Sequence, residues 1–159
     1  HYDPRSRTLR LSDAVYGSRS LAAVGVACHE AGHAVQHARN YAFLGLRTAL
    51  VPASNLGSNL SYFMILIGML IQAWNLVLLG AILFSAVVLF SLVTLPVEWN
   101  ASSRAKRAMV QSAVVTDEEM RQAGKVLNAA FLTYVASAVT ALLTLLYFLF
   151  RAGVLGGDE

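Results

Sequence analysis

Residues 60–97 of the chain read LSYFMILIGMLIQAWNLVLLGAILFSAVVLFSLVTLPV, and this stretch decides the class of fold. No Asp, Glu, Lys, Arg or His occurs anywhere in residues 48–97. A membrane-spanning helix needs about 20 apolar residues, so this charge-free stretch is long enough for two helices. Two polar residues, Gln72 and Asn75, interrupt it. The pattern therefore predicts a hairpin of two membrane helices within residues 56–97.

A third apolar stretch, at residues 128–150, is also of bilayer length. The whole chain of 159 residues is 57% hydrophobic and only 13% charged, whereas a soluble domain carries roughly 25% charged residues. Buried helices of a soluble core are the alternative, but three stretches of this length are unusual there. The net charge of +3 is too small and too scattered for a nucleic-acid binder. We expect an all-α integral membrane protein that contacts the lipid bilayer and no nucleic acid.

One further segment lies on each side of the predicted hairpin. Residues 20–39 predict one helix, and residues 98–127 predict a polar helical insertion that contains the capping-box sequence Thr116-Asp117-Glu118-Glu119. A hairpin returns the chain to the side that it left, so both segments should lie on one membrane face. By the positive-inside rule, the basic residues of this face place it in the cytoplasm of a multi-pass cell-membrane protein. These residues are Arg39, Arg47, Arg104, Lys106, Arg107, Arg121 and Lys125.

The motif His29-Glu30-Ala31-Gly32-His33 contains candidate metal-binding and catalytic residues. Histidines at i and i+4 lie on one side of a helix and can bind a single zinc ion, while the intervening Glu projects toward the metal-bound water of a zinc hydrolase. The rest of this helix is small and apolar, where charged and imidazole side chains are costly unless they are paired or metal-bound. The alternative is a chance match on a solvated helix face.

A catalytic zinc ion needs a third protein ligand. His37 lies about 12 Å along the helix from His29, so one straight helix cannot supply all three ligands. The acids at 117–119 are explained by helix capping, and those at 158–159 fall on the opposite membrane face in this topology. Glu98 remains as the third ligand, although a carboxylate at the end of a membrane span is also an ordinary interfacial charge.

Several segments together resemble the YugP-like family of bacterial membrane proteins, which are classed as neutral zinc metallopeptidases. The resemblance implies that His29 and His33 bind zinc and that Glu30 is the catalytic base. It covers residues 1–159 as a single domain, without the N-terminal hydrophobic segment that members usually carry. The segments that carry it are His1-Tyr2-Asp3-Pro4, residues 26–37, residues 51–59, Pro96-Val97-Glu98-Trp99-Asn100-Ala101-Ser102 and residues 125–135.

A more distant likeness is to the HtpX and CAAX prenyl protease zincins. In that group a Glu on a later helix, followed by Ala-Asp, completes the zinc site. Glu98 and Ala101 match this pattern, but Ser102 stands where that group has Asp. The likeness therefore does not identify the residue that orients the metal ligands by a hydrogen bond.

These observations predict a zinc-dependent membrane endopeptidase, with Zn²⁺ held by His29, His33 and Glu98 and with Glu30 as general base. Its substrates should be membrane-associated or unfolded proteins near the membrane surface. The candidates for stabilising the oxyanion are Asn100, Arg104 and His37. One competing interpretation is a zinc-binding membrane scaffold or chaperone without peptidase activity. Another is a small transport or assembly subunit that holds no tight zinc.

Overall fold

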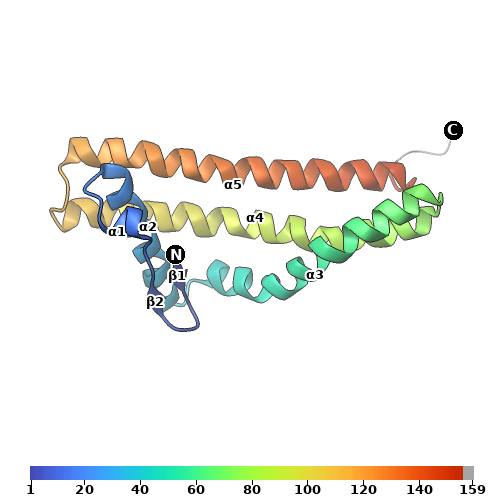
Figure 1. Ribbon diagram of the computed structural model, residues 1–159, viewed down its shortest axis with the longest axis horizontal. Coiled ribbons are helices and arrows are strands. Elements are labelled where there is room, and N and C mark those ends of the chain that lie inside the picture. Colours follow the sequence, from blue (N-terminus) through green and yellow to red (C-terminus); the bar gives the residue numbers. More distant parts are fainter. Residues whose placement is uncertain (156–159) are drawn as a thin grey trace. The chain divides into compact units, whose positions relative to one another are not determined.

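The computed structural model describes residues 1–155, so the acids at 158–159 lie outside the described residues. Most of the described chain is helical, and Figure 1 shows the order of its elements. At the start, β1 (Tyr2–Asp3) pairs antiparallel with β2 (Thr8–Leu9). The helices that follow are α1 (Asp13–Tyr16), α2 (Leu21–Ala38), α3 (Ala42–Leu70), α4 (Trp74–Gln111) and α5 (Asp117–Arg151).

Three of these helices, α3, α4 and α5, are long and apolar enough to cross a membrane. The turn between α3 and α4 falls at residues 71–73, where the polar interruption of the apolar stretch predicts it. The helix predicted at residues 20–39 corresponds to α2. This architecture agrees with an all-α membrane protein.

The long helices extend beyond the apolar stretches that predict them. α4 continues past Glu98 to Gln111, with Pro96 inside it, because residues 99–111 are rich in good helix formers such as Ala, Arg, Lys and Met. Residues 98–127 therefore comprise the end of α4, a short turn and the start of α5. α3 likewise begins at Ala42, well before residue 56, and contains Pro52.

The capping box at the start of α5 forms as its sequence predicts. The Thr116 hydroxyl oxygen accepts from the backbone N–H of Glu119 at 3.3 Å. In return, a carboxylate oxygen of Glu119 accepts from the backbone N–H of Thr116 at 2.9 Å. Two backbone donors that the helix leaves unpaired are thereby satisfied.

The chain forms two compact units, and the first contains residues 1–45 and 95–133. Its buried core joins Ala105 and Met109 of α4 to Ala123 and Leu127 of α5, and side chains of α2 such as Val24 pack against it. The Lys106 ammonium also donates to the Asn128 amide oxygen at 2.6 Å. These contacts hold α2 against the polar ends of α4 and α5.

The second unit contains residues 46–94 and the part of α5 that begins at Tyr134. Here α3 and α4 approach closely at glycines: a Cβ atom at Gly57 would lie 2.6 Å from the carbonyl oxygen of Leu83. Small residues at such contacts are typical of helix pairs in membranes. Large apolar side chains on α5, such as Leu143 and Phe150, are each 60% exposed, as expected of a lipid-facing surface.

Candidate metal centre

Helix α2 is positioned by a cap at its start and by a glycine near its middle. The Ser20 hydroxyl oxygen accepts from the backbone N–H of Ala23 at 3.2 Å, which satisfies one of the free donors of the first turn. At Gly32, a Cβ atom would lie 2.7 Å from the carbonyl oxygen of Ala101 on α4. No larger residue fits there without a shift of the two backbones. This close approach brings the histidines of α2 within reach of α4.

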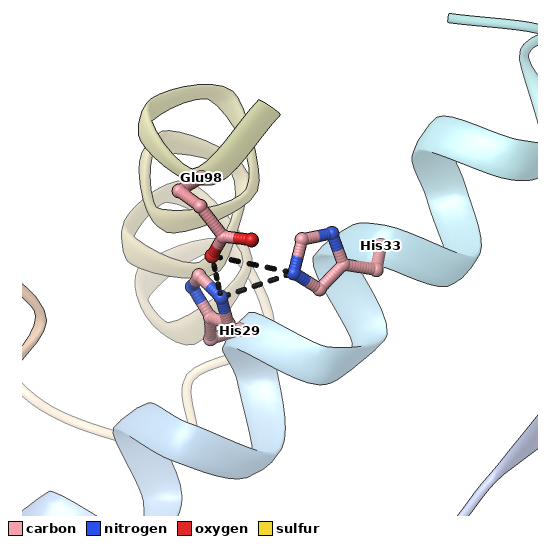
Figure 2. A group of neighbouring side chains, drawn as sticks. All are labelled: His29, His33 and Glu98. Atoms are coloured by element: carbon pink, nitrogen blue, oxygen red, sulfur yellow. Dashed lines mark hydrogen bonds and ion pairs between the residues drawn. The ribbon is translucent and has the colours of Figure 1, made fainter. Parts of the chain in front are cut away.

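His29, His33 and Glu98 converge on one point, as Figure 2 shows. The Nε2 atom of His29 lies 3.1 Å from Nε2 of His33 and 3.1 Å from Oε2 of Glu98. The third separation, from His33 Nε2 to Glu98 Oε2, is 3.6 Å. Ligand atoms that surround a tetrahedral zinc ion at about 2.0–2.2 Å lie about 3.3–3.6 Å from one another. The donor set therefore fits a single zinc ion.

Burial and charge also favour a cation at this point. Glu98 is only 2% exposed, and an unpaired carboxylate in such a place would be costly. Burial lowers the pKa of His33, but the hydrogen bond and the negative charge of Glu98 outweigh it and hold that pKa above its usual range. A metal ion would supply the positive charge that this cluster attracts.

Gln36 fixes the orientation of His33. Its side-chain N–H₂ group donates to the carbonyl oxygen of Val97 at 2.8 Å and to the Asn100 amide oxygen at 3.1 Å. The side-chain amide oxygen of Gln36 therefore faces Nδ1 of His33 at 2.9 Å, where it can only accept a hydrogen bond from the imidazole N–H. His33 then carries its proton on Nδ1, which leaves the Nε2 lone pair free to bind a metal.

Ser102 has the same relation to His29. The Ser102 hydroxyl lies 3.0 Å from Nδ1 of His29, so it can accept the Nδ1 proton and direct Nε2 toward Glu98. Ser102 is thus the residue of α4 that orients His29. Sequence reasoning missed Gln36. Its signal was a polar residue three positions after His33, on the same face of an apolar helix.

Glu30 lies beside the three donor atoms rather than among them. One of its carboxylate oxygens accepts from the backbone N–H of Tyr2 in β1 at 2.9 Å, and its side chain is 20% exposed. The Tyr2 hydroxyl lies 2.8 Å from Nδ1 of His37, so β1 packs along this face of α2. Sequence reasoning did not predict that the start of the chain would contact Glu30.

The remaining candidates have other contacts. Asn100 accepts from Gln36 and also from Nε of Arg104 at 2.7 Å, so its amide oxygen serves to hold these two side chains. Burial raises the pKa of the Cys28 thiol, which disfavours the thiolate that zinc prefers. His37 is paired with Tyr2 and does not join the donor group.

The three donors are two histidines from one helix and a carboxylate from a second helix, and a glutamate directly follows the first histidine. This arrangement is typical of zinc hydrolases. The chain belongs to the family described as "Putative neutral zinc metallopeptidase", whose model matches residues 1–153. It is 50% identical over 148 residues to "Putative membrane protease YugP" of Bacillus subtilis (strain 168). That match covers 93% of this chain and 66% of the relative, so the chain spans just under two thirds of the relative's length. No solved structure matches the chain.

Proposed function

We propose that this chain is a zinc-dependent membrane endopeptidase that hydrolyses peptide bonds near the membrane surface. The observation that carries the proposal is the convergence of His29, His33 and Glu98 next to Glu30. Both histidines are oriented by partners at Nδ1, a feature of built metal sites. The family description and the name of the Bacillus relative support the same activity.

The residues of the site have two different roles, metal binding and proton transfer. His29, His33 and Glu98 would hold the zinc ion, which supplies a Lewis acid that polarises a carbonyl group and lowers the pKa of water. Glu30 accepts a proton from the attacking water while the water oxygen bonds to the peptide carbonyl carbon. Glu30 then delivers that proton to the amide nitrogen as the carbon–nitrogen bond breaks, so the products are a carboxylate and an amine.

The backbone of β1 has a positioning role in this scheme. The Tyr2 N–H group holds Oε2 of Glu30 at 2.9 Å and so restrains rotation of the carboxylate. We assign proton transfer to the other oxygen, Oε1. A general base that is already oriented loses less entropy in the transition state than a freely rotating one.

The location of the site suggests its substrates. The metal centre lies in the unit that contains α2, the basic end of α4 and the start of α5. We place this unit on the cytoplasmic face by the positive-inside rule. Membrane-associated proteins and unfolded chains near the bilayer are the substrates that could reach it there.

The test measures zinc content and proteolysis together, in detergent, on the protein with whatever upstream segment its gene encodes. We expect wild type to hold one zinc ion per chain and to cleave an unfolded membrane protein. Glu30→Gln should keep the zinc and lose cleavage by a factor of at least about 10². Glu98→Ala should lose the zinc as well.

Two results would contradict the proposal. If wild type holds zinc but wild type and Glu30→Gln behave alike on several unfolded membrane substrates, a zinc-binding scaffold or chaperone explains the site better. If wild type holds no zinc, the metal centre itself is wrong.

A further inference from the structure

A cavity beside the contact between α2 and α4 has no part in the proposed hydrolysis. Its volume is about 610 Å³, and Gly32 on α2 and Ala108 on α4 are among its lining residues. At 100° per residue, Glu30 points about 160° away from Gly32 around the helix axis. The cavity is therefore on the other side of α2 from Glu30, so the proposed hydrolysis does not explain it.

Three arginines border this cavity: Arg39, Arg104 and Arg107. None of the lining residues that the structure describes is acidic. Arg104 is held in place because its Nε–H donates to Asn100, a bond that uses one of the five N–H groups of a guanidinium. Three guanidinium groups around one cavity repel one another unless an anion lies between them. Their planar forks match the oxygens of a phosphate group.

Part of the cavity lining is apolar, and this restricts the class of ligand that the cavity can bind. The apolar lining residues are Ala31, Val35 and Ala108, together with Cys28. A free inorganic anion would gain nothing from such a surface, whereas an amphipathic molecule would cover it. The lining thus fits a phosphate group that is attached to an apolar body.

The position along α4 points to the same kind of ligand. The charge-free stretch of this helix ends at Val97. Arg104 and Arg107 follow about 10 and 15 Å further along the helix axis. Long arginine side chains at this distance reach back to the headgroup layer of a bilayer. Basic pockets at the cytoplasmic ends of membrane helices are suited to anionic lipid headgroups.

We propose that this cavity binds the phosphate of an anionic phospholipid, with Arg39, Arg104 and Arg107 around the phosphate and the small apolar residues against the glycerol and first acyl carbons. The site is separate from the metal centre and does not depend on peptidase activity. It would tie the end of α2 to α4 through a lipid molecule.

The test counts lipids bound to the full-length chain in a neutral detergent by native mass spectrometry. Phosphatidylglycerol is the probe and phosphatidylcholine, which has no net charge, is the reference. We expect one tightly bound phosphatidylglycerol per chain and a preference over phosphatidylcholine of about tenfold or more. Both lipids carry the phosphate, but the choline ammonium, which phosphatidylglycerol lacks, would be repelled by the three guanidinium groups. The double variant Arg39→Gln/Arg107→Gln should reduce the preference to about twofold or less.

A matched control variant removes two positive charges at positions outside the cavity. Arg19 and Lys125 are exposed residues of the same unit and do not line the cavity. Arg19→Gln/Lys125→Gln should therefore keep the lipid preference. A second probe of the cavity is Ala108→Glu, a change at an exposed position that adds a repelling carboxylate without removing an arginine. It should also abolish the preference, and it keeps the test valid if the double arginine variant fails to fold.

Three outcomes would overturn the proposal. Equal loss in the cavity and control variants would mean that only net charge matters. No preference for phosphatidylglycerol in wild type would remove the site. Inorganic phosphate that displaces the lipid at equal concentration would show that the cavity takes free phosphate instead. The lipid test does not measure zinc content or cleavage. A negative result in it therefore leaves the peptidase proposal unaffected, and a negative result in the peptidase test leaves the lipid proposal unaffected.

Discussion

At the scale of single residues, the metal centre is built from ligands and from the groups that orient them. Gln36 is fully buried: two of its hydrogen bonds join α2 to Val97 and Asn100 on α4, and the third orients His33 within α2. Ser102 has a similar role for His29. An imidazole whose Nδ1 proton has a fixed acceptor presents one defined lone pair to the metal, so these two residues set the affinity of the site without touching the ion.

Gln36→Leu should weaken zinc binding by about 10–100-fold, because His33 loses the acceptor that fixes its proton on Nδ1. Competition with a chromogenic chelator measures the change in affinity. Gln36→Glu keeps an acceptor opposite His33 and should bind zinc more tightly than Gln36→Leu. Equal affinities for the two variants would show that Gln36 acts only through packing.

At the scale of helices, the close approach of α2 and α4 is what assembles the donor set. Neither helix alone carries three ligands, since α2 supplies the two histidines and α4 supplies Glu98. The distance between the helices is set by Gly32, whose missing side chain lets the Ala101 carbonyl approach. The glycine within the zinc motif is therefore part of the geometry of the site.

Gly32→Ala should destabilise the protein by about 1–3 kcal/mol, because the added Cβ overpacks the contact between the helices. Zinc binding should fall with it, since His33 moves with the backbone of α2. Thermal unfolding and zinc content in detergent are the measurements.

Gly45→Ala provides the control for this substitution. A Cβ atom at Gly45 meets nothing within 4 Å, and alanine is the better helix former by up to about 1 kcal/mol. This variant should keep its zinc and be as stable as wild type or slightly more so. A Gly32→Ala protein that matched Gly45→Ala in both measurements would contradict the role given to Gly32.

At the scale of the whole molecule, the centre links segments that are distant in the chain. Zinc would bridge α2 to α4 across the long sequence separation between His33 and Glu98. A ligand that binds only the folded state stabilises it by mass action, by about 2.7 kcal/mol when its concentration is one hundred times its dissociation constant. A metal ion bound at this centre should thus act as a structural link between the two helices.

Removal of zinc by a chelator should lower the temperature of unfolding, and added zinc should restore it. Glu98→Ala, which lacks the ligand from α4, should show no response to either treatment. Calorimetry or fluorescence in detergent follows the transition. If wild type and Glu98→Ala respond equally to the chelator, the stabilising metal lies elsewhere.

The membrane topology gives a further prediction. Gln72 is exposed in the turn between α3 and α4, and Ser112 is exposed in the turn between α4 and α5. In a Cys28→Ser background, Gln72→Cys should react with an impermeant thiol reagent added outside intact cells. Ser112→Cys should react only after the membrane is opened. The reverse pattern would place the metal centre on the outer face.

Much of this protein was determined by local sequence. The charge-free stretch predicted two apolar helices of bilayer length, and α3 and α4 are both long and apolar enough to cross a membrane. The spacing of His29 and His33 predicted that their side chains lie together on α2, because residues four apart share one side of a helix. Thr116 and Glu119 defined the start of α5 by bonds within a single turn.

The tertiary structure decided what depends on contacts between distant segments. The sequence predicted Glu98 as a ligand by elimination, and only the packing of α2 on α4 brought its carboxylate to 3.1 Å from His29. The same holds for the orienting bond of Gln36, for the contact of Tyr2 with Glu30 and for the cavity bordered by three arginines. Helical periodicity specifies which side of a helix a residue occupies, but not which residue of another helix faces it.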